Sequence, residues 1–137
     1  NPEDFIVIED LLSGGGLKKI YKCISSDEQS PEEIVASYAK NELSQKSVQF
    51  FLISLSQILS ELALAYMPGS GIYIAGGLMR SLQQFLDIDR FMKEFLVNRK
   101  SIHADVLKQI PLAIINQEMT CLHGSLNFIN KFSLNLK

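Results

Sequence analysis

The sequence of 137 residues is 47% hydrophobic and 20% charged, with four prolines and eight glycines. This composition is that of one folded globular domain and excludes a disordered or fibrous chain. Thirteen Lys and Arg residues against fifteen Asp and Glu residues give a formal net charge of −2 without a long basic run, which excludes the electropositive surface of a nucleic-acid-binding protein.

The first predicted unit is a strand, a glycine-rich turn and a helix. Residues 5–8 (FIVI) form a short, β-rich apolar run. Ser13 is a good N-cap for a helix that begins in the glycines at 14–16. Apolar residues recur along that helix at three- and four-residue spacing, at Leu17, Ile20, Tyr21 and Ile24.

Two further helices are predicted before the middle of the chain. Ser30 with Pro31 and Glu33 has the pattern of a capping box with proline at the first helical position, and we expect that helix to run to about Lys40. Residues 44–66 then read as one long helix, because helix-forming residues dominate and neither Gly nor Pro interrupts them.

The long helix is expected to be mostly buried, over a sheet or at the centre of the domain. Its polar residues fall within one wedge of the helical wheel, at Gln49, Ser54, Ser56, Gln57, Ser60 and Glu61. Because the most apolar window, residues 48–67, holds two glutamines, a glutamate and three serines, we do not expect a bilayer span. An interface in a homodimer would suit this helix equally well.

The second half of the chain alternates strands and helices. Strands are predicted at 71–75 (GIYIA) and 112–115 (LAII), and helices after Gly76-Gly77 and at 87–95, 101–107 and 121–131. The alternation predicts an α/β fold in which helix well exceeds strand and a small sheet of two or three strands carries the helices. A sheet this thin indicates that further strands lie in sequence outside this chain.

Two glycine turns lie at predicted strand-to-helix junctions, Ser13-Gly14-Gly15-Gly16 and Gly76-Gly77. Glycine lets a ligand approach the backbone, and a following helix presents free N–H groups and a positive dipole end to an anion. Neither turn has the spacing of a dinucleotide fingerprint or a P-loop. A glycine pair such as Gly76-Gly77 more often only turns the chain, whereas for the turn at Ser13 a flexible segment without function and a ligand role are equally expected. Two such turns in one small domain nevertheless predict a nucleotide cleft more strongly than one turn alone would.

Three segments resemble bacterial glucokinases, in the same order and with similar spacing. VIEDLLSGGGLKKIY (7–21) is similar to the SGPG segment of that family, and GIYIAGGLMRSLQQFL (71–86) is similar to its VFIAGGI segment. IPLAIINQEMTCLHGSLNFI (110–129) resembles its closing strand and GLLGA-type helix. The resemblance implies the hexokinase and actin-like ATPase fold (ribonuclease H-like), with residues 1–137 as a single domain forming its helix-rich C-terminal lobe.

The resemblance also implies a role for the glycine turns. In that family ATP lies between two lobes, so Gly76 and Gly77 would pass close to the nucleoside and the α-phosphate, while Ser13, Gly14 and Gly15 would border the same pocket. These are backbone roles. The implied reaction is transfer of the γ-phosphoryl group of ATP, with Mg²⁺, to the 6-hydroxyl of glucose in the cytoplasm, without a nucleic-acid or membrane partner.

The family's catalytic machinery is not found in this sequence. Its DxGxT-type phosphate loop, its catalytic Asp and its sugar-binding residues precede the segment that Phe5 opens, and the chain begins NPED without Met. No catalytic residue or metal ligand is therefore assigned here, and the chain alone is expected to be inactive. Gly15 stands where the family has Pro, and Cys121 where it has Gly. A kinase for another hexose or amino sugar, and a non-catalytic dimerisation or regulatory module, are the alternatives.

Cysteine and histidine residues are given no chemical role. Cys23 and Cys121 have no CxxC partner, so we predict two free, buried thiols in a reducing compartment. His103 and His123 have no cysteine or acidic partner at metal-ligand spacing, and we expect both on helix surfaces. The sequence therefore predicts neither a zinc site nor a redox pair.

The remaining acidic and aromatic candidates are predicted to be structural. Asp87 and Asp89 are close enough for a carboxylate pair, but on a short surface helix we expect both to be solvated. Phe85, Phe91 and Phe95 are predicted to pack in the core, because no basic residues interleave them as in a surface that stacks nucleobases.

Overall fold

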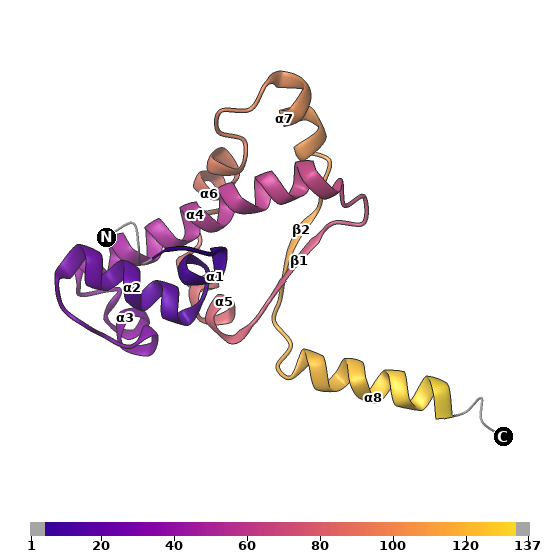
Figure 1. The fold of residues 1–137 in the computed structure, drawn as a ribbon, viewed down its shortest axis with the longest axis horizontal. Helices are drawn as coiled ribbons and strands as arrows, with labels where there is room; N and C mark the ends of the chain where they lie inside the picture. Colours follow the sequence, from indigo (N-terminus) through magenta and orange to yellow (C-terminus); the bar gives the residue numbers. More distant parts are fainter. Residues whose placement is uncertain (1–4, 134–137) are drawn as a thin grey trace.

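A computed structural model describes residues 5–133 of the chain (Figure 1). The elements are, in order, α1 (Ile8–Leu11), α2 (Gly14–Ser25), α3 (Pro31–Ser37), α4 (Glu42–Tyr66), β1 (Ile72–Ala75), α5 (Gly77–Leu82), the 3₁₀ turn η2 (Gln83–Phe85), α6 (Ile88–Phe95), α7 (Ser101–Leu107), β2 (Leu112–Ile115) and α8 (Thr120–Ser133). The predicted helix-rich α/β fold with a small sheet is confirmed.

The predicted strand at residues 5–8 is wrong. Ile8 begins the short helix α1 instead. The Asp10 carboxylate accepts hydrogen bonds of 3.1 Å from the N–H groups of Ile6 and Val7, and this caps the turn that opens the helix. No strand lies beside this segment in the described part of the chain, so its β-forming side chains have nothing to pair with.

The predicted helix starts at Ser13 and Ser30 are confirmed. The Ser13 hydroxyl accepts from the N–H of Gly16 at 3.0 Å. Ser30 and Glu33 form a reciprocal capping box, in which the Glu33 N–H donates to the Ser30 hydroxyl and the Ser30 N–H donates to the Glu33 carboxylate. The long helix begins slightly earlier than predicted, because Asn41 accepts from the N–H of Leu43 at 2.9 Å.

Helix α4 forms the centre of the fold, with α2 and α3 packed near its beginning and α6 and α7 along the rest (Figure 1). Ten of its residues are buried. By length and composition alone it could cross a membrane, but here it supplies the apolar core, including Val48, Phe51 and Leu52. Phe95 of α6 and Leu17 of α2 are fully buried in the same core.

The polar wedge of α4 is only partly solvated, because Gln57 and Glu61 are exposed whereas Ser56 and Ser60 are fully buried. The Ser56 hydroxyl donates to the carbonyl of Phe91 at 2.6 Å, and the Arg99 guanidinium donates to the Ser60 hydroxyl at 3.0 Å. A buried hydroxyl costs little free energy when it is hydrogen-bonded. These serines therefore join α4 to α6 and to the segment that precedes α7.

The sheet contains β1 and β2, which pair in parallel from Ile72 opposite Leu112 to Ala75 opposite Ile115. The connection between them passes through α5, α6 and α7, as parallel pairing requires a crossover. Helix α8 follows β2 and extends away from the other helices (Figure 1), and the side chains described along it are exposed.

The predicted burial of the two thiols is wrong, since Cys23 and Cys121 are both exposed. Cys23 lies on the outer side of α2, away from the buried Ile20 and Tyr21, and Cys121 lies on the exposed α8. The aromatic prediction is confirmed: Phe91 and Phe95 are buried in the core, and Phe85 stacks on Tyr38 with ring centroids 3.9 Å apart.

Asp10 should make the stability of the chain depend on pH at acidic values. Its pKa is lowered by the hydrogen bond from Lys19 and by the N–H groups of Val7 and Ile6. Because the folded-state pKa lies below the unfolded one, this stabilisation is present above the unfolded pKa and is lost as pH falls through the folded pKa. Asp10→Asn should therefore lower the melting temperature at neutral pH, with the difference from the unmodified chain shrinking in acid. The exposed Asp89 offers a control as Asp89→Asn; a difference that stayed constant from neutral to acidic pH would contradict the expectation.

Candidate functional site

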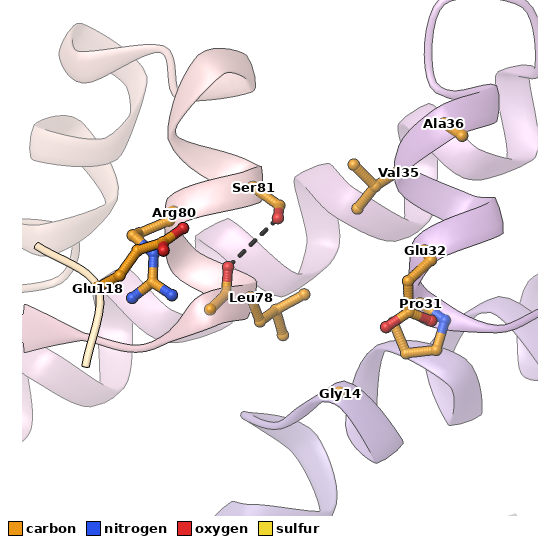
Figure 2. A pocket seen from close by; sticks show the side chains of 10 residues that line it. Gly14, Pro31, Glu32, Val35, Ala36, Leu78, Arg80, Ser81 and Glu118 are labelled. Atoms are coloured by element: carbon orange, nitrogen blue, oxygen red, sulfur yellow. Dashed lines mark hydrogen bonds between the residues drawn. The ribbon is translucent and has the colours of Figure 1, made fainter. Parts of the chain in front are cut away.

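A cavity of about 720 Å³ lies between the beginning of α2 and helix α3 on one side and α5 and the segment after β2 on the other. Its volume is in the range of about 300–1,000 Å³ that is usual for small-molecule sites. In Figure 2, side chains from α5 and the segment after β2 face those of α3 across the opening. The lining residues are Gly14, Pro31, Glu32, Val35, Ala36, Gly77, Leu78, Arg80, Ser81 and Glu118.

The cavity brings together one residue from each predicted glycine turn, Gly14 and Gly77. The other three predicted site residues do not line it. Ser13 uses its hydroxyl to cap α2, and Gly15 and Gly76 are exposed. The two turns are therefore neighbours in the fold, whereas a ligand role for these five residues stays a prediction.

The structure separates the glycines that the fold requires from those that it does not. Gly76 has φ +136°, a conformation that residues with a side chain rarely adopt, so glycine is needed there to turn the chain. Gly16 has no room for a side chain, because an added Cβ would lie 2.2 Å from the Leu11 carbonyl oxygen. At Gly14 and Gly77 a Cβ would make only ordinary contacts, at 3.5 and 3.7 Å. These two glycines on the cavity wall have no structural requirement of their own.

The polar side chains of the cavity were not predicted from the sequence. Arg80 and Ser81 come from α5, Glu32 from the first turn of α3, and Glu118 from the segment after β2. The Ser81 hydroxyl donates to the carbonyl of Gly77 at 3.2 Å, shown dashed in Figure 2. The available signal was the position of Arg80, three residues after Gly77 and so on the same side of a helix.

The lining contains carboxylates, a guanidinium and a hydroxyl, but no histidine or cysteine. These groups can bind and orient a polar ligand through hydrogen bonds. Within residues 5–133 no group of three or more His, Cys, Asp or Glu side chains is placed to hold a metal ion. His103 and His123 are both exposed, as predicted.

A second, smaller cavity of about 230 Å³ lies between the sheet and α6. Its lining is entirely apolar, with Ile74, Met79, Leu86, Ile88, Phe91, Met92, Leu112, Ala113 and Ile114. Because it offers no side chain that could orient or react with a ligand, the larger cavity is the candidate site.

The described chain thus has a helix-rich α/β fold, with its candidate cavity beside the turn from β1 into α5. A solved structure, a glucokinase from an Antarctic psychrotroph, matches 80% of this chain and 36% of its own chain with a TM-score of 0.69. The two sequences are 24% identical. This match supports the helix-rich α/β fold that the sequence predicted.

The chain belongs to the glucokinase family, because the Glucokinase family model matches residues 2–131. A glucokinase-like protein of Xylella fastidiosa (strain Temecula1) is 26% identical over 94% of this chain and 39% of its own length. A glucokinase of Chelativorans sp. (strain BNC1) is also 26% identical, over 85% of this chain and 36% of its own length. The chain thus spans about two fifths of the length of the relatives that it matches.

Proposed function

We propose that residues 1–137 form the C-terminal, nucleotide-side lobe of an ATP-dependent glucokinase. The complete protein would transfer the γ-phosphoryl group of MgATP to the 6-hydroxyl of glucose, as a cytoplasmic enzyme of glycolysis. Membership of the glucokinase family supports the reaction class. The proposal extends to the whole protein, since this chain covers only part of the length of its relatives.

The contribution of this chain is the adenosine side of the ATP site. The observation that carries this proposal is that Gly14 and Gly77 line the same cavity, from α2 and from α5, without any conformational or packing need for glycine. Absence of a side chain at both positions leaves backbone for a ligand to approach closely. Gly76 would act indirectly, by turning the chain so that Gly77 and α5 face the cavity.

Phosphoryl transfer needs groups that this chain does not supply by itself. Catalysis rests on positioning both substrates and on neutralising phosphate charge with Mg²⁺. Mg²⁺ is held by one or more carboxylates together with phosphate oxygens and water, and the described residues do not gather a metal-binding cluster. We therefore assign the Mg²⁺ ligands, the glucose-binding residues and the catalytic base to the rest of the protein.

The proposal is tested by separating binding from turnover. The 137-residue chain should show weak heat on calorimetric titration with ATP but no glucose-dependent formation of ADP. Gly77→Val should weaken ATP binding by about tenfold, or ~1.4 kcal/mol, because the added side chain would occupy the cavity wall. Gly69→Val is the matched control, since an added Cβ there meets no atom within 4 Å and Gly69 lies outside the cavity.

Two outcomes would contradict the proposal. An absence of binding of both ATP and adenosine at millimolar concentration would remove the adenosine role, and glucose phosphorylation by the chain alone would remove the assignment of catalysis to the rest of the protein. Assays of the complete protein with glucose, other hexoses and amino sugars decide the sugar. A complete protein without any transfer would instead be a regulatory or dimerisation module.

A further inference from the structure

Arg80 occupies a particular position on the wall of the large cavity. It is partly buried, and its guanidinium folds back over the glycine turn, so that Nη2 would lie 3.7 Å from a Cβ added at Gly77. Within residues 5–133 its guanidinium forms no hydrogen bond or salt bridge. A planar cation that is partly withdrawn from water and unpaired is available to a ligand.

The charges of the cavity do not fit a polyphosphate. One arginine, Arg80, stands against two glutamates, Glu32 and Glu118, so the lining carries a formal charge of −1. The two carboxylates would repel phosphate oxygens. They are suited instead to accept hydrogen bonds from neutral donors such as the hydroxyls of a ribose or the amino group of a purine base.

The apolar side chains of the lining, Pro31, Val35, Ala36 and Leu78, include no aromatic ring. Nucleobases are usually held between flat or apolar groups. The Arg80 guanidinium is the flat group in this lining, and guanidinium groups stack on aromatic faces. Figure 2 shows Leu78 pointing toward Pro31 and Val35 across the cavity, with Arg80 and Glu118 drawn on the α5 side.

From this arrangement we infer that the cavity takes the nucleoside alone, with Arg80 stacked on the base and Glu32 and Glu118 facing its hydrogen-bond donors. The phosphate chain then leaves the cavity toward the part of the protein outside this chain. The inference rests on the proposed adenosine role and adds the residues that select the nucleoside. It makes Arg80 a binding residue, which the family's glycine motifs do not identify.

Titration of the 137-residue chain with adenosine and with ATP, at low and at moderate salt, tests the inference. Adenosine should bind at least as tightly as ATP, and added salt should strengthen ATP relative to adenosine by screening the repulsion from the two glutamates. Arg80→Ala removes the guanidinium, and Arg80→Lys keeps the positive charge but not the planar group. Both should therefore weaken adenosine binding by about three- to fivefold. Arg90→Ala, an exposed arginine of α6 outside this cavity, should leave it unchanged.

The possible failures point to different conclusions. ATP binding about tenfold tighter than adenosine binding, and weakened by salt, would place phosphates in the cavity and overturn the inference while the proposed function stands. Unaltered adenosine binding by Arg80→Lys would overturn the stacking role. Absence of binding by both compounds would overturn the proposed adenosine role itself. The comparison of the two compounds on the unmodified chain remains decisive even where an Arg80 variant fails to fold.

Discussion

Phe95→Ala should destabilise the chain by about 3–5 kcal/mol, as is usual when a large buried aromatic side chain is truncated. Phe95 is fully buried on α6, in the core that α4 shares with α2 and α6. The truncation removes apolar contacts and leaves a cavity that the surrounding helices fill only in part. Since a small domain has only about 5–15 kcal/mol of stability, this single change could leave a large fraction of molecules unfolded.

Phe50→Ala is the matched control for this effect. Phe50 lies on α4, but its side chain is 52% exposed, so its truncation should cost less than about 1 kcal/mol. Urea unfolding of the three proteins, followed by circular dichroism, measures both differences. Equal midpoints for Phe50→Ala and Phe95→Ala would show that the core does not have the arrangement described.

Gly16→Ala should destabilise the chain by about 1–3 kcal/mol, although alanine is the better helix former by about 1 kcal/mol. The added Cβ would lie 2.2 Å from the Leu11 carbonyl oxygen and 2.9 Å from that of Asp10. Both are backbone atoms, so α1 has to move away from α2 to admit the methyl group. This close approach explains why glycine stands at this position.

Gly15→Ala should have the opposite sign and stabilise the chain by about 0.4–1 kcal/mol. Gly15 is exposed, and an added Cβ would meet only the Ser13 hydroxyl oxygen at 3.6 Å. Denaturant midpoints of the two variants, measured side by side, check the prediction. If Gly16→Ala were as stable as Gly15→Ala, the packing of α1 against the start of α2 would differ from that described.

Local patterns predicted most of the helices and both strands. Ser13 and Ser30 mark helix starts because their hydroxyls accept from N–H groups only three residues away. The spacing of Ile20 and Tyr21 marks a buried helix face in the same local way. The run at residues 5–8 was mispredicted because strand pairing depends on a distant neighbour, whereas the capping by Asp10 is local.

Burial was harder to predict than helix or strand. The serines Ser56 and Ser60 are polar by composition but buried, since α6 and Arg99 supply their hydrogen-bond partners from distant parts of the chain. Cys23 and Cys121 are exposed although cysteine is often buried. In each case the environment is set by which elements pack together, and a residue type alone does not reveal this.

By itself, the sequence determined that two glycine turns precede two helices, and its resemblance to glucokinases supplied their order. Only the tertiary structure decided that Gly14 and Gly77 share a cavity while Gly76 turns the chain and Gly16 admits a neighbouring backbone. It also placed Arg80 and Glu118 in the lining of one cavity, although four elements separate them along the chain. Turn and helix signals act over a few residues, whereas a cavity forms only when distant segments pack around it, and packing depends on the whole chain.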